Sequence, residues 1–122
     1  MKMMIKAACK IWLLKKNEKA FGQGPCDLLR RVEKTNSLHQ AALQMGMSYN
    51  KAWRLIQLLE KRLGFPLLEK QVGGQSGGGS QVTPRAKDLI KRYERFETDA
   101  IKAIEKAYQK HFGSRSGRKG GR

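Results

Sequence analysis

The chain has 122 residues, with 26 Lys or Arg against 10 Asp or Glu and a formal net charge of +16. This length suits one domain, and so large an excess of cations favours a polyanionic partner. No apolar run approaches 18 residues and no signal-peptide cleavage pattern is present, so we expect no membrane partner and a cytoplasmic protein.

The first 24 residues predict a β-hairpin followed by a break. Apolar residues alternate with others over residues 5–14, a period of two that is typical of a strand with one buried face. Residues 15–18 are polar and suit a turn, and residues 19–21 can form the returning strand. Gly22, Gly24 and Pro25 then end the pairing.

A helix is predicted next. Asp27 is a candidate N-cap, and the apolar residues Leu28, Leu29 and Val32 would share one side of a helix ending near Thr35. That apolar side would lie under the two helices that follow, which completes a three-helix core.

The segment over residues 37–64 predicts a helix-turn-helix. Gly46 marks the bend, Ala42 lies four residues before it where only a small side chain lets helices cross closely, and Ser48 can cap the second helix. Ala52, Leu55 and Ile56 recur at helical spacing on that helix. An ordinary helical hairpin with a glycine turn is the alternative.

The second helix of this motif enters the major groove of DNA, where its first residues meet base edges. The candidate contacts at its start and on its outward face are Ser48, Tyr49, Asn50, Lys51, Trp53, Arg54 and Gln57. Trp53 could instead pack inward.

A short hairpin, or wing, is predicted after Pro66. Residues 67–72 and 81–83 read as strands, and five of the eight residues between them, GGQSGGGS, are glycine. A flexible linker is the alternative, but a linker should separate two domains. Glycines let backbone N–H groups approach phosphates. Candidate DNA contacts in and beside the wing are Lys70, Gln75, Ser76, Thr83 and Arg85.

A long helix of about 28 residues, roughly 42 Å, should begin with Thr83 as N-cap and Pro84 in its first turn. Its apolar residues recur seven apart in two rows, which predicts a seam that includes Ala86, Leu89, Tyr93, Phe96, Ala100, Ala103 and Ala107. A three-helix core cannot cover so long a face, so we expect a homodimer. Packing on the chain's own hairpin, or on a different subunit, is the alternative.

Catalysis and metal binding are not expected. Cys9 and Cys26 stand 17 positions apart without a CxxC pair, and we read both as structural thiols. His39 and His111 lie on separate predicted helices, with no carboxylate or cysteine at catalytic spacing. We therefore expect no enzyme and no cofactor.

The segments KIWLLKKNEKAFGQG, SLHQAALQMGMSYNKAWRLI, LEKRLGFPLLEK, GGQSGGG and QVTPRAKDLIKRY together resemble the N-terminal DNA-binding domain of the ModE family of molybdate-responsive regulators, itself similar to the LysR-type winged helix. The resemblance covers roughly residues 1–112. It implies a dimer, formed through the last helix and the N-terminal strands, whose recognition helix and wing contact an operator. Only ten residues, glycine-rich and basic, follow Phe112, so molybdate or tungstate sensing is not expected of this chain.

The predicted fold class is mainly α with small β: a winged helix-turn-helix with an N-terminal β-hairpin and a long C-terminal dimerisation helix. Residues 1–112 would form this domain, and residues 113–122 a basic tail without fixed structure before it meets nucleic acid. The predicted function is sequence-specific regulation of transcription by a homodimer on double-stranded DNA. Non-specific, chromatin-type binding is the rival, because charge alone gives sequence-independent affinity.

Overall fold

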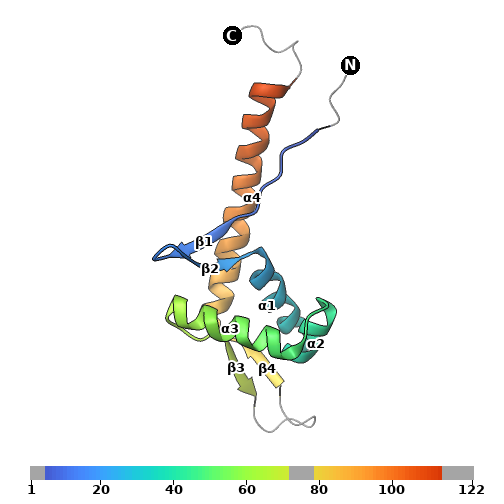
Figure 1. Ribbon diagram of the computed structural model, residues 1–122, viewed down its shortest axis with the longest axis vertical. Helices are drawn as coiled ribbons and strands as arrows, with labels where there is room; N and C mark the ends of the chain where they lie inside the picture. Colours follow the sequence, from blue (N-terminus) through green and yellow to red (C-terminus); the bar gives the residue numbers. More distant parts are fainter. Residues whose placement is uncertain (1–4, 72–78, 114–122) are drawn as a thin grey trace.

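The computed structural model describes residues 5–71 and 79–113 (Figure 1). In chain order the elements are β1 (Trp12–Lys15), β2 (Glu18–Gly22), α1 (Gln23–Thr35), α2 (Leu38–Gln44), α3 (Tyr49–Leu63), β3 (Leu68–Gln71), β4 (Gly79–Val82) and α4 (Pro84–Phe112). The strands form two antiparallel hairpins, β1 with β2 and β3 with β4. The predicted fold class, mainly α with small β, is confirmed.

The core lies where α1 packs against α2, α3 and the first turns of α4. The fully buried α1 residues Leu28, Leu29 and Val32 are in one cluster with residues from β2, from the other helices and from the wing. Ala42 of α2 and Ala52 of α3 have no exposed surface, as expected where two helices cross closely. The predicted three-helix core is therefore confirmed.

The turn between α2 and α3 has the predicted geometry. Gly46 has a φ of +70°, a conformation that glycine adopts without steric cost, and the Met47 N–H donates to the Ala42 carbonyl over 3.0 Å. The Ser48 hydroxyl accepts a hydrogen bond from the Lys51 backbone N–H at 3.1 Å, so Ser48 is the N-cap of α3.

The predicted start of α1 at Asp27 is wrong. The helix begins at Gln23, with Gly22 as its N-cap, and Asp27 lies inside it, paired with Arg31 one turn later at 3.0 Å. Pro25 is tolerated because the first N–H groups of a helix have no partner within it. The predicted end at Thr35 is confirmed, and the next residue, Asn36, caps the helix in the left-handed conformation.

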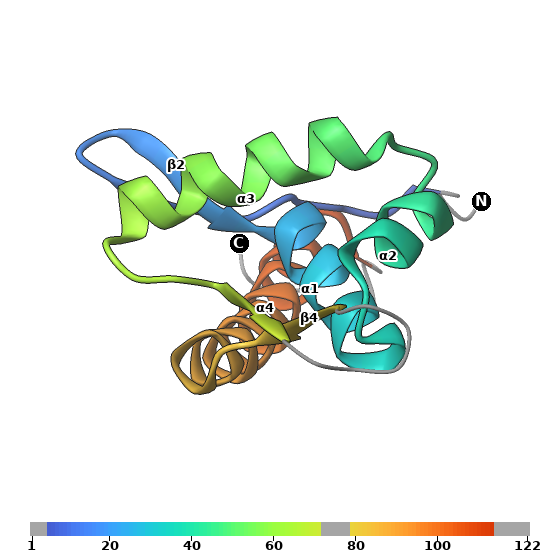
Figure 2. The ribbon, with the colours of Figure 1, turned by 90° about the horizontal axis from the view of Figure 1, so that it is seen from below.

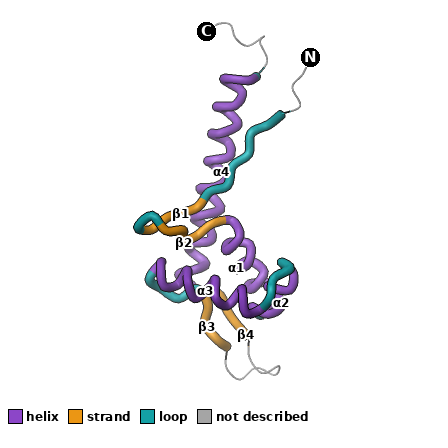
Figure 3. The backbone as a smooth tube through the Cα atoms, viewed as in Figure 1, coloured by secondary structure: helices purple, strands orange, loops and turns teal. Residues whose placement is uncertain are grey.

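The predicted strand over residues 5–14 is wrong in its first half. Residues 5–11 are extended without a strand partner in the described chain, and they run beside α4 (Figure 3). Two hydroxyls of α4 hold the ends of this segment: Tyr108 donates to the Ile5 carbonyl and Tyr93 to the Ile11 carbonyl, both at 2.8 Å. Apolar residues at every second position indicate an extended backbone, whereas a β-strand also needs a second strand to pair with.

The long helix α4 begins as predicted, with Thr83 as N-cap and Pro84 at its first position, and has 29 residues. Its first turns are buried in the core at Ala86, Ile90 and Tyr93. It then extends away from the core (Figure 1), and Phe96 there is 50% exposed. None of the described helices has both the length and the apolar character to cross a membrane.

Thr83 joins the wing to α4, and its loss should destabilise the fold. Its hydroxyl donates to the Pro66 carbonyl at 2.8 Å and accepts from the Ala86 N–H at 3.1 Å. Thr83→Val keeps the shape but leaves both groups unpaired, so we expect the free energy of unfolding, measured in urea, to fall by about 1–3 kcal/mol. Thr83→Ser, which keeps the hydroxyl, is the control and should lose clearly less. Equal losses in the two variants would contradict this role.

Candidate nucleic-acid interface

The outward face of α3 has a row of polar side chains. Ala52, Ile56 and Leu59 take the buried side of the helix, which leaves Asn50, Arg54 and Gln57 exposed, one turn apart from one another. Viewed from below, α3 lies along one side of the molecule and α4 on the other (Figure 2). The row is therefore open to a large partner along its whole length.

The remaining candidates on α3 surround that row. Ser48 and Lys51 are exposed at the start of the helix, where the backbone N–H groups carry partial positive charge that favours an anion. Tyr49 is 45% exposed, with its ring 5.9 Å from that of His39 of α2. Trp53 is 39% exposed, so the inward alternative for this side chain is wrong.

The wing is held against the end of α1. Its register pairs Leu68 with Val82 and Lys70 with Ser80, and the Ser80 N–H donates to the Asn36 carbonyl at 3.0 Å. Lys70 is exposed on β3. Gln75 and Ser76, predicted to contact DNA from the wing, lie outside the described residues.

Two candidates beside the wing differ in what they can contact. Arg85 is exposed at the start of α4, with its guanidinium 4.4 Å from the centre of the Phe65 ring. Thr83 is only 5% exposed and its hydroxyl is committed to Pro66 and Ala86, so the prediction that Thr83 contacts DNA is wrong. A capping hydroxyl and a DNA-binding hydroxyl look alike in a sequence.

The predicted seam on α4 divides into two parts. Phe96, Ala103 and Ala107 are exposed and Ala100 is half-buried, so these side chains have surface left for a partner. Tyr93 is 2% exposed and packs edge-on against Phe21 at 5.4 Å, and its assignment to a seam between chains is wrong. Leu89 is half-buried and also packs against the core. The heptad rows continue across the point where α4 leaves the core, so spacing alone could not locate this division.

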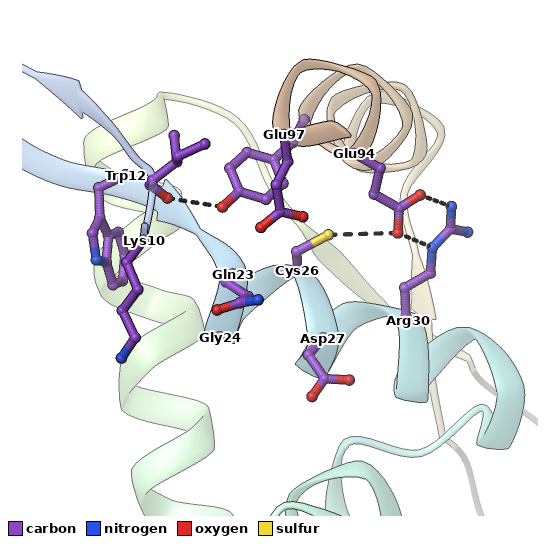
Figure 4. Close-up of a pocket in the computed structure, with 11 residues that line it drawn as sticks. Lys10, Trp12, Gln23, Gly24, Cys26, Asp27, Arg30, Glu94 and Glu97 are labelled. Carbon is purple, nitrogen blue, oxygen red and sulfur yellow. Dashed lines mark hydrogen bonds and ion pairs between the residues drawn. The ribbon is translucent and has the colours of Figure 1, made fainter. Parts of the chain in front are cut away.

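Sequence reasoning missed a cavity of about 530 Å³ between the N-terminal segment, α1 and α4 (Figure 4). The Arg30 Nε donates to Glu94 Oε2 at 2.9 Å, and the Cys26 thiol lies 3.8 Å from the same oxygen. Hydrogen bonds from Arg30 lower the pKa of Glu94. Cys26 and Arg30 of α1 precede Glu94 of α4 by 68 and 64 positions, and no local pattern signals their meeting.

This cavity has no sign of a catalytic centre. Burial is the main cause, and the nearby Glu94 carboxylate the second, of a Cys26 pKa raised to about 12. Burial also raises the pKa of Tyr93 to about 12. Both groups therefore stay protonated near neutral pH and are poor nucleophiles. Among the described residues no three His, Cys, Asp or Glu side chains gather as a metal site would need.

The two cysteines should differ in reactivity. Cys9 is exposed and Cys26 is buried. With a pKa of about 12, Cys26 has only about one thiolate in 10⁴ at pH 8. Iodoacetamide at pH 8 should therefore modify Cys9 first and reach Cys26 only after denaturation, as read by mass spectrometry of the peptides. Equal rates in the folded protein would contradict the burial of the thiol.

Comparisons with known proteins agree with this geometry. The chain is 36% identical over 70 residues to the transcriptional regulator ModE of Haemophilus influenzae, covering 57% of this chain and 28% of that protein. It is 34% identical over 77 residues to the molybdenum-pterin-binding protein MopB of Rhodobacter capsulatus, covering 63% of this chain and 28% of that protein. It is 33% identical over 67 residues to the DNA-binding transcriptional dual regulator ModE of Escherichia coli K12, covering 55% and 26%. The chain thus spans less than a third of the length of these relatives, and the resemblance to ModE regulators is confirmed.

A solved structure shows the same fold. The crystal structure of the DNA-binding domain of BenM with benA site 1 DNA superimposes with a TM-score of 0.54 at 20% identity, covering 75% of this chain and 97% of that one. This likeness supports the winged helix-turn-helix architecture. The model of the bacterial regulatory helix-turn-helix proteins of the LysR family matches residues 26–87. Such domains are DNA-binding parts of transcription regulators and are not enzymes. Since the match spans half of the chain, this protein belongs to the LysR family of bacterial regulatory helix-turn-helix proteins.

Proposed function

We propose that this chain is a sequence-specific transcriptional regulator that binds an inverted-repeat operator as a homodimer, through α3 and the wing. The observation that carries the proposal is the exposed row Asn50, Arg54 and Gln57 on a helix that the core holds by its opposite face. These side chains can hydrogen-bond base edges, whereas binding to the DNA backbone alone would make no use of their chemistry.

The positions of Asn50 and Arg54 suit direct readout. An arginine can pair in bidentate fashion with guanine in the major groove, and an asparagine with adenine. Both side chains are exposed, and no ion pair within the described residues holds Arg54. Ser48, Tyr49, Lys51 and Trp53 would support them from the first turns of the helix.

Contacts to the sugar-phosphate backbone would come from the wing and the start of α4. Lys70 and Arg85 are exposed cations on these elements. In our proposal Gln75 and Ser76, which lie between the two wing strands in the sequence, donate hydrogen bonds to phosphates, and the basic tail beyond residue 113 adds further charge. Such contacts set affinity and register, and the row on α3 supplies the sequence preference.

The homodimer would form along the part of α4 that leaves the core. Phe96 is 50% and Ile101 43% exposed, and Ala103 and Ala107 are small enough to let two helices approach. A two-fold dimer presents the same surface from both chains, so its two recognition helices would read inverted half-sites about 34 Å apart.

Selection of DNA fragments by the purified protein at about 150 mM salt tests the function directly. We expect enrichment of a motif with two-fold symmetry. Binding without an enriched motif would support non-specific, chromatin-type binding instead.

Arg54→Ala should weaken binding to the selected operator by about 1–3 kcal/mol and relax the preference at one base pair. Affinity for a random duplex should change much less, and fluorescence anisotropy on both duplexes measures the difference. Lys102→Ala, which removes one charge from the exposed surface of α4, is the control. Equal losses on operator and random DNA would refute a reading role for Arg54.

Phe96→Glu should give a monomer that still folds. Because Phe96 is half exposed in the single chain, the change costs its own core little, but a dimer would bury the new charge without a partner. Light scattering should show half the mass of the parent protein, and cooperative operator binding should fail. Lys102→Glu places the same charge on another side of α4 and should stay dimeric. A parent protein that is already a monomer at micromolar concentration would overturn the dimer.

A further inference from the structure

The turn of the β1–β2 hairpin is fixed against the last turn of α3. Arg62 of α3 donates from Nη1 to the Lys19 carbonyl at 2.9 Å, and its Nε lies 3.6 Å from Glu18 Oε1. Lys15 donates from Nζ to the Leu63 carbonyl at 3.3 Å. Figure 2 shows the hairpin turn beside that end of the helix. These contacts join the turn to the last turn of α3.

The two elements enclose an open groove of about 340 Å³, which we name the hairpin groove. Its lining consists of four cations, one carboxylate and one leucine: Lys15, Lys16, Lys61, Arg62, Glu18 and Leu58. The carboxylate, Glu18, is engaged by Arg62. The nearby Glu60 accepts from the Leu67 N–H at 2.7 Å and the Leu68 N–H at 3.2 Å. In the described part of the chain no ion pair engages Lys16 or Lys61.

Lys61 also lies on the reading face of α3. It follows Gln57 by four residues, as Arg54 follows Asn50, so all four side chains share one stripe of the helix. Lys61 follows Asn50 by eleven positions, about 16 Å along the axis, whereas the major groove of B-DNA is about 12 Å wide. A helix that runs across the groove with its first turn at the bases would therefore bring its last turn to the phosphates at the edge of the groove.

We propose that the hairpin groove binds the phosphate backbone of the DNA strand that borders the major groove entered by α3. This inference rests on the proposed function, since it assumes that α3 enters the groove. The turn residues Lys16 and Asn17 have φ values of 52° and 66°, typical of the tight two-residue turn that joins the strands of a β-hairpin. They connect β1 directly to β2. Lys16 and Lys61 then neutralise phosphates from both sides of the groove, while Lys15 and Arg62 hold the hairpin in place.

Backbone binding of this kind has a distinct signature. A contact to a phosphate carries no base preference, so its loss lowers the affinity for every duplex by a similar factor. Binding of a variant that lacks the contact also releases fewer counterions. The slope of log K against log salt then becomes shallower by about 0.9 for each lost contact. A reading residue such as Arg54 behaves in the opposite way, because its loss changes the ratio between operator and random DNA.

The test compares the double variant Lys16→Gln/Lys61→Gln with the parent protein on the selected operator and on a random duplex, between about 50 and 200 mM salt. We expect a slope shallower by about 2 per protomer on both duplexes and an unchanged preference between them. The control, Lys91→Gln/Lys102→Gln, removes two exposed charges eleven residues apart on α4 and should leave the slope unchanged. Both sites of the double variant are exposed, and equal urea midpoints verify the fold.

The outcomes separate the two proposals. An unchanged slope in the double variant, with a symmetric motif still selected by the parent, overturns the hairpin groove and leaves the function intact. A parent protein that selects no motif overturns the function, while a shallower slope on random duplex still supports the phosphate contact. Phosphate-ethylation interference gives a second readout: ethyl groups at the edge of the site should weaken the parent but not the double variant. A loss confined to single-stranded RNA would overturn the assignment to duplex DNA.

Discussion

The close crossing of α2 and α3 is the constraint on which the rest of the molecule depends. Ala42 and Ala52 are both fully buried there, and the left-handed Gly46 turns the chain between the two helices. A larger side chain at either alanine would separate the helices and rotate α3 away from its present direction. The exposed row on α3 owes its orientation to this contact and to the cap at Ser48, since neither Asn50 nor Arg54 takes part in the core.

Helix α4 couples the core to the surface that extends beyond it. The Thr83 hydroxyl at its start donates to the Pro66 carbonyl just before the wing, and the Tyr93 hydroxyl donates to the Ile11 carbonyl just before the β1–β2 hairpin. Arg30 of α1 holds Glu94 by a charged hydrogen bond. The low pKa of Glu94 keeps this carboxylate ionised as the pH falls, so the link between α1 and α4 weakens only in acid. The direction of α4 is therefore set by the same core that positions α3. In a dimer formed through α4, the same packing would therefore hold the two α3 helices at a fixed distance and orientation.

The charged side chains of the fold differ in whether they form ion pairs. Several carboxylates are engaged by arginines within the fold, Asp27, Glu33 and Glu94 among them, and no ion pair among the described residues includes a lysine. Exposed ion pairs of this kind add little to stability. The excess of cations provides surface for a polyanion. Lys61, Lys70 and Arg85 are exposed on α3, on β3 and at the start of α4.

Local signals in the sequence were enough for the helix-turn-helix, the wing strands and the start of α4, because a glycine turn, a serine cap and a Thr-Pro pair each act within a few residues. These signals failed where the sequence offers two possible starts for one helix, or where a strand would need a second strand to pair with. Asp27 could cap a helix, yet α1 begins at Gln23 with Gly22 as its N-cap. Residues 5–11 have the period of a strand without a strand beside them in the described chain. Only the tertiary structure decided that Thr83 and Tyr93 are interior groups, that the β1–β2 turn meets the end of α3, and that Cys26 meets Glu94. Each of these contacts joins residues far apart in the chain, and their distance is set by how the helices pack rather than by any spacing that a sequence displays.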